Sequence, residues 1–222
     1  MSSTVPLVVS QILQILGALL LLTAFATIAS RHVGDYIRAF AVQSLVLALA
    51  AVTVGYVVHS IDLFVVAALT VLVKTGLIPY ILKNVSNRLH LKREVGLYLN
   101  VPASLLAGVS LTLLAFFTSP TLVVPGTFLN EPPLAVSVSL VLIGLFIMST
   151  RRHAIAQVLG LLTVENGLFS GAIAIAYGMP LIVEFGILFD ILVAVLVMGL
   201  LVILIQREVV TADTAELRRL RG

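Results

Sequence analysis

The sequence contains no cysteine and few charged residues. Cysteine is absent from all 222 residues, and only 10% of them are Asp, Glu, Lys or Arg. The lack of cysteine excludes disulfides, cysteine-ligated zinc, iron–sulfur clusters and thiol nucleophiles from the chemistry of this chain. Soluble domains carry about one quarter charged residues, whereas this chain is 60% hydrophobic with a mean hydropathy of +1.20. We therefore expect lipid to be the solvent for most of the chain.

Several catalytic and cofactor motifs are also missing from the sequence. It has no glycine-rich phosphate loop, no H-E-x-x-H and no G-x-S-x-G, so it does not resemble a self-contained hydrolase or an ATP-driven pump. Its histidines, His32, His59, His90 and His153, lie in loops or at the ends of apolar segments. This placement gives no facing pair for a bis-histidine haem. We expect no cofactor and no metal site in this chain.

Seven apolar segments are long enough to cross a bilayer or close to it. A membrane-spanning helix needs roughly 20 apolar residues, and charged, proline-rich and glycine-rich stretches separate such segments here. They cover residues 8–29, 39–58, 62–82, 97–117, 134–150, 153–177 and 180–206. The sequence therefore predicts an all-α integral membrane protein with about seven transmembrane helices.

The basic residues alternate between the two sides of these spans. Of the 13 Lys and Arg residues, all except Lys74 follow spans one, three, five or seven. They are Arg31, Arg38, Lys83, Arg88, Lys92, Arg93, Arg151, Arg152, Arg207, Arg218, Arg219 and Arg221. The positive-inside rule makes that side cytoplasmic, with the N-terminus outside and the C-terminus inside. We interpret these clusters as topology determinants rather than as sites for nucleic acid or anionic lipid.

The spans fall into groups separated by irregular segments. The stretch from Thr118 to Pro133 is rich in proline, so we expect an irregular outer loop there. Asp213 and Glu216 have the spacing of a helix capping box, which predicts a short tail helix. The expected division is a three-helix bundle at 1–95, a connecting helix and outer loop at 96–133, a second three-helix bundle at 134–206, and a cytoplasmic tail helix at 207–222. Whether the two bundles are true repeats stays open.

Three ionisable residues lie at hydrocarbon depth: Lys74, Glu165 and Asp190. Each ionised group at a helix centre costs about 2.5–3.5 kcal/mol to insert, so something other than insertion must favour it. One interpretation is a buried ion pair between Lys74 and either Glu165 or Asp190. The other is proton or ion handling, because burial favours the neutral form of acids and lysines alike. Asn166 and Glu184 are accessory candidates for such a path.

The neighbours of these residues predict how their helices pack. Gly160, Gly167 and Gly171 share one helix face, and Glu165 lies about 140° away from it at 100° per residue. We expect the glycines to contact one helix and Glu165 to face another. Pro79 follows Lys74 by five residues, and its missing N–H predicts a kinked helix beside the lysine.

Three stretches carry a resemblance to a known family. They are QVLGLLTVENG at 157–167, YGMPLIVE at 177–184 and FDILVAV at 189–195. These stretches resemble the E component of hydrogenase-4. That resemblance implies a membrane subunit without a redox centre in a complex I-related, energy-converting hydrogenase or formate hydrogenlyase. Its expected partners are antiporter-like and other membrane-arm subunits, within the cytoplasmic membrane and without nucleic acid.

The last three spans also resemble the K subunit of respiratory complex I and the C subunit of multisubunit cation/proton antiporters. In the K subunit two membrane glutamates take part in proton transfer. By this resemblance Glu165 matches the first and Asp190 the second, with Asp in place of Glu, whereas Lys74 has no counterpart. Two other functions stay open from the residues themselves: a free-standing secondary ion or solute transporter, and a purely structural or assembly subunit.

Overall fold

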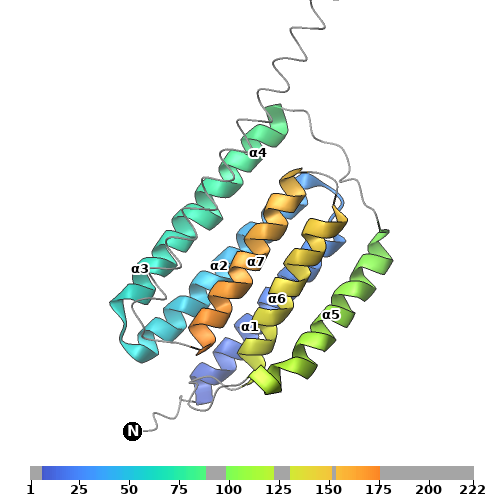
Figure 1. Ribbon diagram of the computed structural model, residues 1–222. Helices are drawn as coiled ribbons and strands as arrows, with labels where there is room; N and C mark the ends of the chain where they lie inside the picture. Colours follow the sequence, from blue (N-terminus) through green and yellow to red (C-terminus); the bar gives the residue numbers. More distant parts are fainter. Residues whose placement is uncertain (1–6, 89–98, 123–130, 152–153, 176–222) are drawn as a thin grey trace, which may run out of the picture.

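The computed structural model describes residues 7–88, 99–122, 131–151 and 154–175, and this part of the chain is helical (Figure 1). The elements are α1 (Leu7–Ala29), α2 (Val33–Val58), α3 (Ile61–Thr70), the π-helical segment η1 (Val71–Leu77), α4 (Ile78–Arg88), α5 (Val101–Leu122), α6 (Glu131–Thr150) and α7 (Ala154–Ile175). Six stretches are long and apolar enough to cross a membrane, with α3, η1 and α4 forming one span over Ile61–Asn84. The helical membrane fold is confirmed. The predicted seventh span and the tail helix lie outside the described residues.

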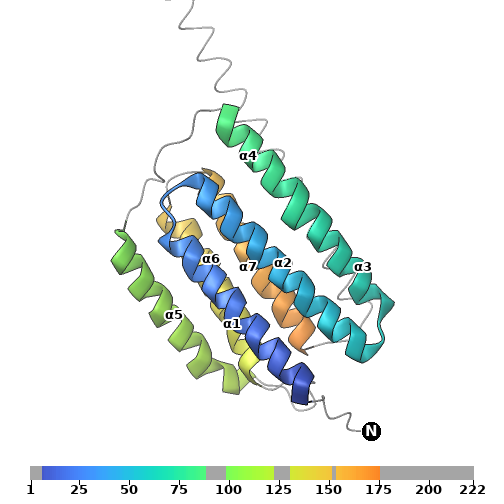
Figure 2. The same ribbon diagram turned by 180° about the vertical axis from the view of Figure 1, so that it is seen from behind.

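The helices form a bundle with α5 at one edge and the α3–α4 rod at the other (Figures 1 and 2). Between these edges, α1 contacts α2, α5 and α6, while α2 contacts α7 and the α3–α4 rod. The first helices of the two suggested repeats, α1 and α6, therefore touch each other, as do the second helices, α2 and α7. The division into two three-helix bundles stays a prediction, because span seven is outside the described ranges.

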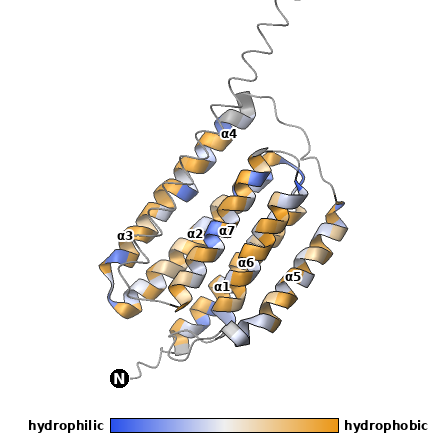
Figure 3. Cartoon of the chain, in the orientation of Figure 1, coloured by the Kyte–Doolittle hydropathy of each residue, from blue (hydrophilic) through white to orange (hydrophobic). Residues whose placement is uncertain are grey.

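Apolar residues predominate along the helices (Figure 3), and many of them are exposed on the outside of the bundle. On α5, for example, Leu106 is 70% exposed and Phe117 is 84% exposed. In water such a surface would be an aggregation liability, but lipid solvates it at no cost. The bundle is therefore built for a bilayer.

The closest helix contact joins α6 and α7 through glycine. A Cβ atom added at Gly160 would lie 2.8 Å from the Met148 Cγ, and one added at Gly167 would lie 2.8 Å from the backbone nitrogen of Val141. The expectation that this glycine face packs against a neighbouring helix is confirmed. Because α6 occupies that face, Glu165 faces the α3–α4 rod instead.

Two helices begin at different residues from those predicted. The second helix begins at Val33 rather than near residue 39. In its first turn, the Asp35 carboxylate lies 3.7 Å from the Arg38 guanidinium and 3.6 Å from the His32 ring nitrogen Nδ1. A carboxylate near a helix N-terminus is favourable, so these charges extend the helix beyond the apolar run. The fourth span begins at Val101, because the Asn100 side chain caps it by accepting from the Ala103 N–H at 3.1 Å.

The predicted outer loop from 118 to 133 was too long. Helix α5 continues through Pro120 to Leu122, and α6 already begins at Glu131. Prolines in the first turn of α6 replace N–H groups that would have no helical acceptor. In α5, Pro120 leaves the Phe116 carbonyl without its usual donor, and the Ser119 hydroxyl donates to that carbonyl at 3.2 Å. Only residues 123–130 of the predicted loop lie outside the described helices.

A buried arginine joins α6 to the end of α1. Arg151 is 1% exposed, its Nη2 donates to the Ile28 carbonyl at 2.6 Å, and its guanidinium lies 5.7 Å from the centre of the Tyr36 ring. Burial lowers the pKa of Arg151 from its very high ordinary value, and the neighbouring Tyr36 opposes that effect. The sequence identified Arg151 as a loop charge, whereas the structure gives it a packing role.

We predict that Gly144→Ala destabilises the bundle. The new Cβ would lie 2.7 Å from both the Gly160 carbonyl oxygen and the Val164 backbone nitrogen, so the two helices must separate. Such overpacking costs roughly 1–3 kcal/mol, which should appear as a lower midpoint of unfolding in SDS titrations. Gly34→Ala is the matched control, because a Cβ added at Gly34 would meet nothing within 4 Å. Equal midpoints for the two variants would contradict this packing.

A second prediction concerns Arg151→Ala. The change removes a charge-assisted hydrogen bond to a carbonyl, a contact of about 1.5–3 kcal/mol, together with the contact to the Tyr36 ring. We expect a clear loss of thermal stability in detergent. Arg31→Ala removes an exposed arginine from the same end of the bundle and should change stability little. If Arg31→Ala were as harmful as Arg151→Ala, loop charge rather than the buried contact would be responsible.

Candidate functional site

Lys74 lies in the π-helical segment η1. The amide of Ile78 donates to the carbonyl of Val73, five residues back, instead of to a carbonyl four residues back. The π-helical turn lies just before Pro79, which has no N–H to donate to the Thr75 carbonyl. The wider turn accommodates this missing backbone hydrogen bond. The disruption expected at Pro79 therefore takes the form of a π-helical turn, and the rod continues through it in both views (Figures 1 and 2).

The ammonium group of Lys74 forms an ion pair with Glu165 of α7. Its Nζ lies 2.9 Å from the Glu165 Oε1, and the two residues are only 2% and 3% exposed. The same Nζ donates to the Asn166 Oδ1 at 3.3 Å. Of the two pairings that the sequence left open, the structure forms the one between Lys74 and Glu165.

Asn166 extends this polar contact to a third helix. Its Nδ2 lies 3.3 Å from the Gln43 Oε1 and 3.3 Å from the Ser44 Oγ, both on α2. Gln43, Ser44 and Asn166 are each 0% exposed. A connected set of polar side chains thus crosses the interior from η1 through α7 to α2. We call Lys74, Glu165, Asn166, Gln43 and Ser44 the polar cluster.

One aromatic ring lies beside the polar cluster, and two buried polar atoms in this region have no hydrogen-bond partner. The Phe169 ring centre lies 5.9 Å from the Lys74 Nζ. Within the described part of the chain, the Gln43 Nε2 and the Thr75 Oγ1 are buried without a hydrogen-bond partner. Buried polar atoms without a partner are rare in folded proteins, and bound water or a catalytic role are among the explanations for them.

The attraction between Lys74 and Glu165 is about equal to the cost of inserting their two charges into the membrane. Inserting two ionised groups costs about 5–7 kcal/mol in total. Two unit charges 2.9 Å apart attract each other by about 6 kcal/mol at an effective dielectric constant of about 20. Pairing therefore offsets insertion without adding much stability, and a change in protonation of either partner would leave an uncompensated charge. Protonation and pairing are thus coupled.

The structure brings together some of the predicted residues. Lys74, Glu165 and Asn166 meet in the polar cluster, whereas Asp190 and Glu184 lie outside the described residues. Sequence reasoning missed Gln43 and Ser44. Their signal was a pair of adjacent polar residues inside the apolar second span, and the observed start of α2 at Val33 places them near the middle of the helix.

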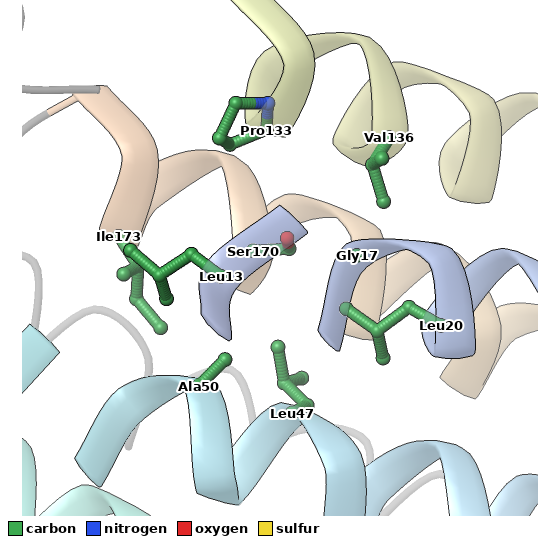
Figure 4. A pocket seen from close by; sticks show the side chains of 9 residues that line it. All are labelled: Leu13, Gly17, Leu20, Leu47, Ala50, Pro133, Val136, Ser170 and Ile173. Atoms are coloured by element: carbon green, nitrogen blue, oxygen red, sulfur yellow. The ribbon is translucent and has the colours of Figure 1, made fainter. Parts of the chain in front are cut away.

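A small cavity lies elsewhere in the bundle, between α1, α2, α6 and α7 (Figure 4). Its volume is about 30 Å³. Apart from Ser170, the side chains around it are apolar, including Leu13, Leu47 and Ile173. An apolar cavity of this size stays dry. None of its lining residues belongs to the polar cluster, so the two features are separate.

Comparisons with known proteins identify two groups of relatives. Uncharacterized protein Rv0085 of Mycobacterium tuberculosis is 42% identical over 132 residues, which cover 59% of each chain. Hydrogenase-4 component E of Escherichia coli K12 is 30% identical over 217 residues, 96% of this chain and 99% of the relative. The Shigella flexneri component E matches equally well. No family model matches the chain, and no solved structure matches it significantly.

The relationship to component E extends over both chains nearly from end to end, rather than over the C-terminal stretches alone. The matched region thus includes the first three spans as well as α7. Together with the six membrane-spanning helices, it shows that this chain is a multi-pass protein of the cytoplasmic membrane and belongs to the hydrogenase-4 component E family.

Proposed function

We propose that this chain is a membrane-arm subunit of a complex I-like, energy-converting hydrogenase or a related redox complex, in which Lys74, Glu165 and Asp190 form part of a proton path. The observation that carries the proposal is the ion pair of Lys74 with Glu165, buried in the bundle and joined by Asn166 to α2. Membership of the component E family supports the assembly, since the relative's name places it in a hydrogenase.

The polar cluster suits proton transfer between helices. A proton that reaches Glu165 neutralises its carboxylate and removes the counter-charge of Lys74. The ammonium group of Lys74 then loses most of its electrostatic stabilisation. This loss favours release of a proton from Lys74 to the next group of the path, which leaves Lys74 as a neutral amine. Asn166 lies beside both partners and offers an amide oxygen to the ammonium group while the pair is open.

Asp190 is the expected continuation of this path. By the resemblance to the K subunit of complex I, it corresponds to the second of two membrane carboxylates, after Glu165. Glu184 and Asn166 serve as accessory groups in the proposal. The proposal assigns no redox centre to this chain, so electron transfer in partner subunits would bias the protonation of the cluster.

A structural role is the second candidate, and the closed geometry of the ion pair favours it. A contact of 2.9 Å between buried side chains on η1 and α7 could hold the α3–α4 rod against the bundle without any proton transfer. The two functions differ in whether a correctly assembled complex without titratable groups at these positions can still translocate protons.

We predict that Glu165→Gln lowers proton translocation by the assembled complex about tenfold or more, a barrier change of about 1.4 kcal/mol. Glutamine preserves the shape of the side chain but cannot accept a proton. The measurement is proton uptake by vesicles during turnover, compared with electron transfer through the solubilised peripheral arm, which should stay intact.

Two control variants separate proton transfer from assembly. Glu165→Gln alone leaves Lys74 without its counter-charge, so Lys74→Met with Glu165→Gln should recover assembly but not translocation. Thr163→Val removes a buried hydroxyl from α7. Among the described residues this hydroxyl donates to the Leu159 carbonyl of its own helix, so its loss should leave translocation unchanged. Normal translocation by an assembled Glu165→Gln complex would refute the proton path.

The charge swap tests the structural role directly. We predict that Lys74→Glu combined with Glu165→Lys restores assembly relative to either single change, because the buried pair is re-formed with opposite polarity. Proton translocation should stay impaired, since the order of acid and base along the path is reversed. If the swap restored both assembly and translocation, the pair would be a structural contact alone.

A further inference from the structure

A groove separates the start of α2 from α4 near the end of the bundle where basic residues gather. Its volume is about 560 Å³, and its walls come from residues 32–41, at the start of α2, and residues 79–86 of α4. The two helices run in opposite directions, so α2 begins and α4 ends at the same end of the bundle (Figures 1 and 2). The sequence separates these walls by some forty residues, and only the fold brings them together.

The groove changes from apolar to basic along its length. Ala41 and Pro79 line the end toward the bundle centre, while Arg38 and Lys83 line the end toward the basic connections. Ile37 forms part of the wall on α2 and is 5% exposed. A charged mouth above an apolar channel matches a molecule with an anionic head and a hydrocarbon tail.

The charges at the mouth are free to bind an anion. The Arg38 side chain is 83% exposed, and its contact with Asp35 is long, at 3.7 Å. Asp35 does not line the groove. Among the described residues Lys83 forms no ion pair. Two cations from different helices therefore line one groove, and among the described residues Asp35 is the carboxylate in contact with Arg38.

From this geometry we infer that the groove is a binding site for an anionic phospholipid of the leaflet on the basic side. Arg38 and Lys83 bind the phosphate, and one acyl chain lies along Ile37, Ala41 and Pro79. Tyr80, 70% exposed at the groove edge, is placed for contact with the glycerol region. Basic pockets between transmembrane helices bind lipid headgroups in this way. The role is compatible with topology, since both use positive charge at the membrane surface.

Lipid binding to the purified full-length protein tests the assignment. Phosphatidylglycerol is titrated into delipidated protein and measured by native mass spectrometry, with phosphatidylcholine as the neutral comparison. Arg38→Gln with Lys83→Gln should weaken phosphatidylglycerol binding about thirtyfold, the combined effect of two surface cations. Arg31→Gln, an exposed arginine outside the groove, should leave binding unchanged. Equal binding by wild type and the double variant would overturn the inference.

Two further arms identify the occupant. Ala41→Phe fills the apolar part while keeping both charges, so it should also weaken phosphatidylglycerol binding; if inorganic phosphate alone competes fully with the lipid, the groove is an anion site and the inference fails. In native membranes, a photoreactive phenylalanine at position 80 should yield a phospholipid adduct. An adduct with another polypeptide or with this chain's own tail, or no lipid adduct at all, would overturn it.

Discussion

The ion pair between Lys74 and Glu165 is the interaction around which the described bundle is organised. Lipid cannot solvate either charge, so the two must meet inside the protein or remain neutral. Meeting requires the α3–α4 rod to lie against α7 at one register. The π-helical turn η1 carries Lys74 at that level, and Asn166 ties the pair to α2. A constraint of electrostatics thus fixes the position of three helices.

The contact between α6 and α7 supports this arrangement from the opposite side. Glycines at 160, 167 and 171 let α6 approach the backbone of α7, which leaves the Glu165 face for the rod. In a bilayer such close packing replaces the hydrophobic effect as the force between helices. At the basic end, Arg151 fixes α6 to the last carbonyls of α1.

Sequence reasoning recovered the membrane fold, the six spans that the structure describes and the opposed faces of α7, because hydropathy and helical period are local properties. It placed Glu165 and Asn166 correctly at mid-helix but left the partner of Lys74 open, since pairing depends on the register of two distant helices. Gln43 and Ser44 were missed for the same reason. The outer loop was made too long because proline was read as a helix breaker, although Pro132 and Pro133 occupy a first turn, where proline is favourable.

Proton transfer through the polar cluster requires Glu165 to change its protonation state during turnover. Infrared difference spectroscopy of the assembled complex measures this directly through the carbonyl stretch of a protonated carboxylic acid, assigned by its loss in Glu165→Gln. If Glu165 carries protons, this band should appear and disappear with turnover and shift in ²H₂O. A Glu165 carboxylate that stays ionised in every state of the cycle would contradict it and leave the pair as a fixed contact between helices.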